Sequence, residues 1–209
     1  KILSMQSSFF SVLISKFMSF KISIRVSEDP CRSFFHKENL IKASLVYISK
    51  ILTYNLADKV IVNSSDSQKC LKKISINKNK VIKLYNPALL TLKKNLKIKN
   101  NKTILNVGRF CKQKNQILLL NAFKKLTEFD KNYKLILCGD GPDKQKIIYE
   151  CKKLRITKKV KIVKWRGDIS NLYKKSSLFI LTSLYEGMPN VLIEALNHNM
   201  ICLSTKVSG

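Results

Sequence analysis

Acidic residues, histidines and long apolar runs are scarce in this 209-residue sequence. It has 13 Asp and Glu against 40 Lys and Arg, two histidines, and six cysteines that form no C-x-x-C pair. The usual ligand spacing of a zinc site is therefore absent. Lys16 interrupts the apolar residues near the start, no small-residue cleavage site follows, and nothing approaches the ~20 apolar residues of a spanning helix. We expect a protein that is soluble or peripheral to a membrane.

Arginine is scarce too, although the formal net charge is +27. The arginines are Arg25, Arg32, Arg109, Arg155 and Arg166. Proteins that read nucleic-acid sequence rely on bidentate arginine contacts, so we expect no specific nucleic-acid partner. The spread lysines could attract the chain to an anionic membrane surface, but a general compositional bias explains them equally well. Scattered cysteines in apolar runs indicate buried thiols in a reducing, cytosolic compartment.

The sequence does have enough apolar content for a core, with 45% hydrophobic residues. In its first part, apolar spacing predicts helices at 5–20, 38–56 and 65–74 and strands at 21–26, 59–64 and 81–85. Ser65-Asp66-Ser67-Gln68 has the form of a capping box at the start of the third helix. The polar, basic residues 91–102 are predicted to form an exposed connection between two domains.

A regular alternation of strands and helices follows that connection. The predicted strands are 103–108, 133–138, 160–165, 177–181 and 201–204. The predicted helices are 115–129, 142–154, 169–175 and one that begins at Pro189. Such an alternation predicts a parallel, doubly wound sheet, in which ligands bind beyond the carboxyl ends of the strands.

The segment 185–196 carries two carboxylates around a predicted helix start. Pro189 suits the first helical position, which places Glu186 in the preceding loop and Glu194 inside the helix. The backbone N–H groups of residues 189–192 would then form an anion site, supported by the helix dipole. Carboxylates beside such donors suit a ligand that has both hydroxyls and phosphates. The alternative is an ordinary strand–loop–helix connection with two surface glutamates.

Three earlier strand ends carry further candidate residues. After the first strand, Gly108 allows a ligand close to the backbone, and Arg109 and Lys114 could neutralise a diphosphate. The turn Gly139-Asp140-Gly141-Pro142 lacks the third glycine of a dinucleotide fingerprint, which argues against a nicotinamide cofactor. Trp165-Arg166-Gly167-Asp168 could offer a flat surface or backbone groups to a base, although a turn with a core tryptophan explains it as well.

The four strand-end motifs occur in the order G-R-x4-K, G-D-G-P, G-D and E-G-M-P-x4-E. This series resembles the retaining, nucleotide-sugar-dependent glycosyltransferases of family 4. The spacing of Glu186 and Glu194 matches the signature pair of that family, and residues 57–64 and 85–87 resemble the close of its acceptor domain. The resemblance implies an α/β protein of GT-B type with two Rossmann-like, doubly wound parallel-sheet domains, both incomplete. They would be an acceptor-side domain at 1–90, a linker at 91–102 and a donor-binding domain at 103–209.

The resemblance also implies roles for individual residues. Arg109 and Lys114 would hold the donor diphosphate and stabilise the leaving group, and Glu186 would face the transferred sugar; these three are the expected catalytic residues. Glu194 would accept hydrogen bonds from the ribose. The full expected donor-binding set is Arg109, Lys114, Trp165, Arg166, Glu186, Gly187, Met188, Asn190, Val191 and Glu194. No metal or other cofactor is implied, and the sequence has no Asp-x-Asp motif.

The implied reaction moves a sugar from a UDP- or GDP-sugar to a glycan or lipid-linked acceptor with retention, in surface polysaccharide, lipopolysaccharide or glycoconjugate biosynthesis. The expected location is the cytoplasm, or the inner face of the cytoplasmic membrane as a peripheral protein. A Gly-rich loop and a histidine of the family's first half are not recognisable. His36 is interpreted as a loop residue, and His198 as a capping or surface residue at a helix end. We therefore expect a fragment truncated at both ends that has little or no activity alone.

A different class of protein would also fit the composition. The chain could be a basic module that binds a membrane or nucleic acid, with a degenerate Rossmann-like domain and no catalysis. Its phosphate affinity would fall steeply with salt and would not depend on Glu194.

Overall fold

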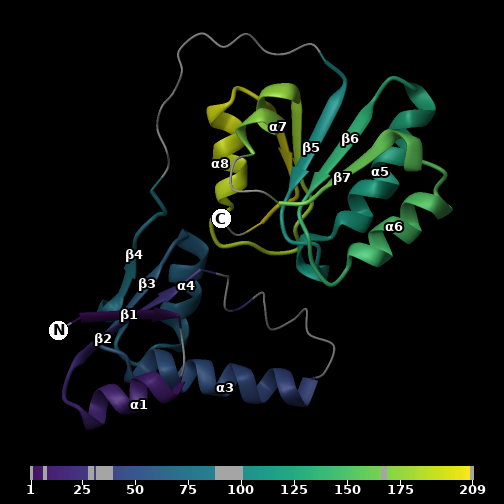
Figure 1. The fold of residues 1–209 in the computed structure, drawn as a ribbon. Coiled ribbons are helices and arrows are strands. Elements are labelled where there is room, and N and C mark those ends of the chain that lie inside the picture. The colour runs from purple at the N-terminus through teal and green to yellow at the C-terminus, as the bar shows by residue number, and fades with distance from the viewer. Residues whose placement is uncertain are drawn as a thin grey trace. The chain divides into compact units, whose positions relative to one another are not determined.

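The computed structural model describes residues 2–6, 9–27, 31, 40–87, 101–165 and 169–207. They form two compact units, the first containing most of the described residues before 88 and the second most of those after 100 (Figure 1). Each unit has its own parallel sheet with helices packed against it. The predicted linker at 91–102 lies mostly outside the described residues.

The first unit contains a four-stranded parallel sheet in the order β1-β2-β3-β4. Its strands are β1 (Ile2–Gln6), β2 (Lys21–Val26), β3 (Lys59–Val62) and β4 (Val81–Lys83). Its helices are α1 (Phe9–Phe17), α3 (Leu40–Leu56) and α4 (Ser65–Ile74), with a 3-10 turn at Lys78–Lys80. The two central strands supply half of the buried core residues, and Val12, Tyr54 and Leu71 join them from the helices.

Two local predictions in this unit need correction. The predicted helix 5–20 is a strand, β1, followed by the shorter helix α1, because Ile2–Gln6 finds a parallel partner in β2 that no local pattern reveals. The helix α4 spans Ser65–Ile74 as predicted, but the cap expected at Ser65 is displaced by one residue. Ser64 is the N-cap, and its hydroxyl accepts from the Ser67 N–H at 3.1 Å.

The cysteines behave in two ways. Cys138 and Cys151 are buried thiols, as predicted, and burial raises the pKa of both, that of Cys151 to about 11. Cys31 and Cys70 are instead joined by a disulfide, which differs from the prediction of a chain kept reduced.

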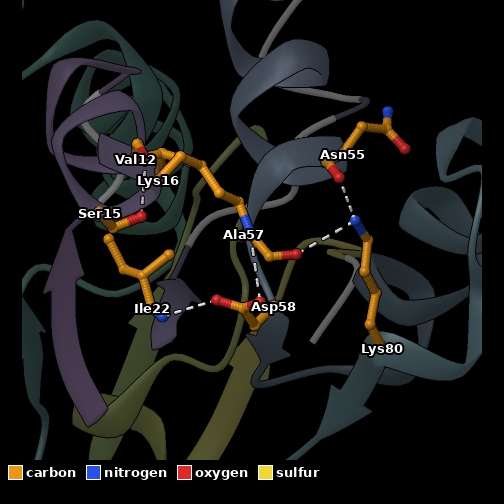
Figure 2. A network of polar contacts seen from close by, with 8 residues as sticks. All are labelled: Val12, Ser15, Lys16, Ile22, Asn55, Ala57, Asp58 and Lys80. Carbon is orange, nitrogen blue, oxygen red and sulfur yellow. Dashed lines mark hydrogen bonds and ion pairs between the residues drawn. The ribbon is translucent and has the colours of Figure 1, made fainter. Parts of the chain in front are cut away.

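Asp58 ties the end of α3 to the start of β2 (Figure 2). One of its carboxylate oxygens accepts from the Ile22 N–H at 2.8 Å, and the other pairs with Lys16 Nζ at 3.3 Å. The Asp58 N–H donates in return to the Ile22 carbonyl at 3.1 Å. Next to it, Lys80 Nζ donates to the carbonyls of Asn55 and Ala57 at the end of α3. This network fixes the connection from which β3 starts.

We expect Asp58→Ala to destabilise the first unit by about 1 kcal/mol near pH 7, because the Ile22 N–H loses a charged acceptor. The Ile22 N–H and then Lys16 hold the pKa of Asp58 below its usual value. A lowered folded-state pKa gives stability that is present above the unfolded pKa and is lost as the pH falls through the folded one. Urea unfolding of both proteins at pH 7 and pH 3 should show the difference shrinking at pH 3. The exposed Asp66, changed to Asn, is the control, and an equal loss there would contradict the assignment.

The second unit contains a five-stranded parallel sheet in the order β7-β6-β5-β8-β9. Its strands are β5 (Thr103–Val107), β6 (Lys134–Cys138), β7 (Val160–Val163), β8 (Leu178–Leu181) and β9 (Ile201–Ser204). Its helices are α5 (Gln116–Phe129), α6 (Lys144–Lys153), α7 (Ser170–Lys175) and α8 (Asn190–Asn197), with 3-10 turns at Lys112–Lys114 and Thr157–Lys159. The predicted alternation of strands and helices is confirmed.

Alternate residues of the strands enter two separate cores, because successive side chains of a strand point to opposite faces. Ile104 packs with α5 and α6 on one face of the sheet, and Leu105 packs with α7 and α8 on the other (Figure 1). The four predicted helix starts are too early. α6 begins at Lys144, two residues after Pro142, and α5, α7 and α8 each begin one residue later than predicted, with Pro189 as the N-cap of α8.

Candidate active site

The order of the second sheet has a switch point between β5 and β8. From β5 the chain adds β6 and then β7 on one side, and it continues with β8 and then β9 on the other. The loops that leave the carboxyl ends of β5 and β8 therefore diverge. Ligands of open α/β sheets bind in the crevice at such a point.

The loops after β5 and β6 are held together by backbone hydrogen bonds. The N–H of Phe110 donates to the Asp140 carbonyl at 2.9 Å, and the Phe110 carbonyl accepts from the Asp143 N–H at 3.0 Å. The phenyl ring of Phe110 is fully buried beneath them. A Cβ on Gly139 would lie 2.0 Å from the Gly108 carbonyl oxygen, so only glycine permits this approach. The backbone at the end of β5 is thus held rigidly.

Lys114 lies at the switch point and is anchored through its backbone to the segment that follows β8. Its carbonyl accepts from the Thr182 hydroxyl at 3.0 Å, and the neighbouring Gln113 carbonyl accepts from the Leu184 N–H at 2.8 Å. The carbon stem of Lys114 lies over Gly108, 3.6 Å from the place where a Cβ would stand. Its ammonium is therefore carried on the loop that follows β5.

Arg109 follows Gly108 directly and is exposed. The side-chain amide of the buried Gln116 donates to the Arg109 carbonyl at 3.0 Å and so fixes the backbone of this residue. The structure thus brings the predicted cations Arg109 and Lys114 into one loop beside the switch point.

Glu194 is held by a buried tyrosine from the preceding helix. The Tyr173 hydroxyl donates to Glu194 Oε2 at 2.8 Å and lies 3.3 Å from the Val191 carbonyl. The Tyr173 ring stacks on His198, with 4.9 Å between ring centroids, and His198 Nδ1 lies 2.8 Å from the Glu194 carbonyl. His198 is the C-cap of α8, in line with its prediction as a helix-end residue.

This arrangement keeps the Tyr173 hydroxyl protonated and fixes the orientation of the Glu194 carboxylate. Burial first, and then the hydrogen bond to Glu194, raise the pKa of Tyr173 above its usual value, so the phenol keeps its proton and remains a donor. A carboxylate has about four acceptor sites, of which Tyr173 takes one. Glu194 can still accept further hydrogen bonds with its orientation fixed.

The remaining predicted residues fall into three groups. Asn190 and Val191 lie in the first turn of α8, and the exposed Trp165 follows β7. Arg166 lies outside the described residues. Glu186, Gly187 and Met188 belong to the segment Tyr185–Met188, which groups with the first unit, so their place beside the donor loops stays a prediction.

The predicted anion site of four backbone donors at 189–192 is smaller than expected. Pro189 has no N–H, and the Leu192 N–H donates to the Pro189 carbonyl at 3.0 Å. Pro189 contributes no donor in any conformation, and Leu192 contributes none because the helix begins with this tighter turn.

Sequence reasoning missed Tyr173, Gln116 and Thr182. Each acts through a hydrogen bond to a residue far away in the sequence or to a backbone carbonyl, and none carries a charge that marks it as functional. Asn106 on β5 was also missed. Its buried amide donates to the Ile180 carbonyl at 2.8 Å, and its side-chain oxygen has no partner. Within the described residues, no three His, Cys, Asp or Glu side chains gather in a way that could hold a metal ion.

The switch point, with a glycine-bounded cationic loop on one side and a fixed carboxylate on the other, belongs to a Rossmann-like, doubly wound sheet. The comparisons make this specific. The family model described as "Glycosyl transferases group 1" matches residues 90–209, more than half of the chain. The chain therefore belongs to the group 1 glycosyltransferase family, and the predicted family relationship is confirmed.

Known proteins resemble the chain on both sides of residue 90. An uncharacterized glycosyltransferase of Methanocaldococcus jannaschii is 32% identical over 198 residues, covering 88% of this chain and 48% of that protein. The UDP-Gal:alpha-D-GlcNAc-diphosphoundecaprenol alpha-1,3-galactosyltransferase of Escherichia coli is 26% identical over 165 residues, covering 72% and 43%. The chain thus spans about half the length of the curated relatives that it matches.

Among solved structures, Anabaena HepE in complex with UDP-glucose resembles the whole chain, with a TM-score of 0.81 at 19% identity, and the match covers 60% of that chain. The likeness confirms the predicted GT-B fold class with its parallel sheets and flanking helices.

Proposed function

We propose that the whole protein transfers a sugar from a nucleotide-sugar donor to an acceptor carried on a lipid, with the second unit binding the donor. The observation that carries this proposal is the Tyr173-held Glu194 on one side of the β5–β8 switch point, opposite the Arg109–Lys114 loop. A carboxylate suits the hydroxyls of a ribose, and two cations suit a diphosphate. The relatives' printed names support both the donor and the acceptor class.

In this proposal Arg109 and Lys114 stabilise the charge that develops on the leaving nucleoside diphosphate, which is usually the largest electrostatic contribution to catalysis. Glu194 accepts from the ribose hydroxyls, with Tyr173 as the residue that positions it. Glu186 faces the transferred sugar, and Gly187, Met188, Asn190 and Val191 line the same loop and helix start. We infer transfer with retention through an oxocarbenium-like state, without a metal ion, because the cations neutralise the diphosphate.

The donor base is proposed to be uracil or guanine, with Trp165 and Arg166 near it. A glycan or lipid-linked acceptor points to surface polysaccharide, lipopolysaccharide or glycoconjugate biosynthesis at the inner face of the cytoplasmic membrane. At that location, cellular reductants would act on the Cys31–Cys70 disulfide.

Calorimetric titration of the chain with UDP, GDP and ADP tests the donor site. We expect clear binding of UDP or GDP, and about tenfold weaker binding after Arg109→Ala, because a charge-assisted contact to phosphate is lost. Arg155→Ala is the matched control, since it removes the same charge from the turn that precedes β7. Equal binding of all three diphosphates, with the same loss in both variants and a steep salt dependence, would favour a basic module without catalysis.

A further inference from the structure

Asn106 is a polar residue on β5, the central strand of the second sheet (Figure 1). The strand reads Thr-Ile-Leu-Asn-Val, whereas a strand covered on both faces of a parallel sheet is normally a near-continuous apolar run. The Asn106 side chain is 2% exposed, and its oxygen has no hydrogen-bond partner among the described residues. An unpaired buried carboxamide oxygen is unfavourable, so stability alone would favour an apolar residue here.

The side-chain amide of Asn106 stands where the ladder between β5 and β8 ends. β5 pairs with β6 along its whole length, from Thr103 to Val107, but its pairing with β8 stops at Leu105. The Asn106 amide then donates to the Ile180 carbonyl at 2.8 Å. A side chain thus takes the backbone acceptor at which the ladder would otherwise continue.

The segment after β8 pairs with the Lys112–Lys114 turn instead of with β5. The Thr182 hydroxyl donates to the Lys114 carbonyl at 3.0 Å, and the Leu184 N–H donates to the Gln113 carbonyl at 2.8 Å. The chain that leaves β8 therefore changes its partner, from the strand to this turn, directly after the carboxamide contact. The same turn carries one of the two cations of the candidate site.

We propose that Asn106 is a positioning residue of the donor site, because it ends the β5–β8 ladder and so leaves the chain after β8 to hold the turn that carries Lys114. The inference rests on the proposed function, in which Lys114 meets the donor diphosphate. With an apolar residue at position 106, the Val107 N–H has no competitor for the Ile180 carbonyl, and the ladder can continue. The turn would then lose its place beside the end of β8, and the Lys114 ammonium would be displaced from the diphosphate.

Calorimetric titration of Asn106→Leu with UDP and UMP tests this role, with GDP and GMP in their place where the chain prefers guanine. In the unchanged chain the diphosphate should bind more tightly, because its second phosphate adds charge beside Lys114. Asn106→Leu should weaken binding of the diphosphate about tenfold and that of the monophosphate by no more than about threefold. Leucine is similar in size to asparagine and removes the unpaired oxygen, so the midpoint of urea unfolding should stay the same or rise.

Asn101→Leu is the matched control. The Asn101 amide also donates to a backbone carbonyl, that of Lys175 at 3.1 Å, but it lies before the start of β5, at the opposite edge of the sheet. Its replacement should leave the difference between diphosphate and monophosphate unchanged. A second variant, Asn106→Thr, keeps a side-chain donor on a residue that favours strands, and it should lose less of this difference than Asn106→Leu.

A double-mutant cycle with Lys114→Ala shows whether Asn106 acts through this lysine. The loss caused by Asn106→Leu should be much smaller in a chain that already lacks the ammonium. Full additivity would overturn the proposal. Equal losses for the diphosphate and the monophosphate, or a lowered unfolding midpoint, would overturn it as well, since Asn106 would then support the core alone.

Failure of the proposed function would look different. The unchanged chain would then bind the diphosphate no more tightly than the monophosphate, whatever residue stands at position 106, and the role of Asn106 would fall with it. A preference for the diphosphate that Asn106→Leu leaves intact and Arg109→Ala removes would overturn the role of Asn106 alone.

Discussion

Alanine at Gly139 is expected to destabilise the second unit by about 3 kcal/mol or more, one of the largest effects available to a single methyl group. The new Cβ would lie 2.0 Å from the Gly108 carbonyl oxygen and 3.0 Å from a ring carbon of Phe110. Neither can move away easily. Gly108 follows the central strand and its N–H donates to the Cys138 carbonyl at 3.0 Å, while the Phe110 ring is fully buried.

Chemical unfolding followed by circular dichroism measures this loss, with Asp140→Ala as the control in the same turn. That change adds no atom against Gly108 and removes only local contacts to the Gly141 N–H and Lys144. It should therefore shift the midpoint far less than Gly139→Ala. If both variants unfold at the same denaturant concentration, the close approach of the two glycine loops does not limit the stability of this unit.

The sequence contains most of the information that defines the second unit. Its strands are short apolar runs separated by helical spacing, with glycine and proline at the boundaries, and this local punctuation is what pattern reasoning detects. The same reasoning fails at β1, because Ile2–Gln6 becomes a strand only by pairing with β2. It also misplaces Pro189, since the choice between N-cap and first helical residue depends on one hydrogen bond from Leu192.

Part of the site follows from topology as well. Three of the predicted residues are charged and follow strand ends. Arg109 and Lys114 lie in the loop after β5, and Glu194 lies in the helix after β8. The carboxyl ends of parallel strands share one edge of a sheet, so these residues are expected to lie near one another. The residues that hold them are not visible in this way. Tyr173 lies 21 residues from Glu194 in a short helix, where a tyrosine reads as an ordinary core residue. The disulfide between Cys31 and Cys70 was missed for the same reason, since 39 residues separate two cysteines that no motif connects.

Phenylalanine at Tyr173 is expected to weaken binding of the nucleoside diphosphate about tenfold or more while leaving the fold intact. The change removes one hydroxyl, whose hydrogen bond to the Glu194 carboxylate is charge-assisted and of the kind that contributes about 1.5–3 kcal/mol. The ring contacts with His198 and Phe179 remain. Glu194 keeps its charge but loses the donor that fixes its orientation.

A ribose analogue separates this positioning role from a structural one. The unchanged chain should bind UDP or GDP more tightly than the corresponding 3′-deoxy nucleotide, because Glu194 accepts from the ribose hydroxyls. In Tyr173→Phe this difference should shrink, and the two losses together form a double-mutant cycle whose coupling measures how well Tyr173 orients Glu194. Tyr149→Phe removes a hydroxyl from an exposed tyrosine on α6 and should change neither affinity. Equal losses for the two nucleotides in Tyr173→Phe would mean that the hydroxyl supports α8 alone, and Tyr173 would then have no part in recognising the ribose.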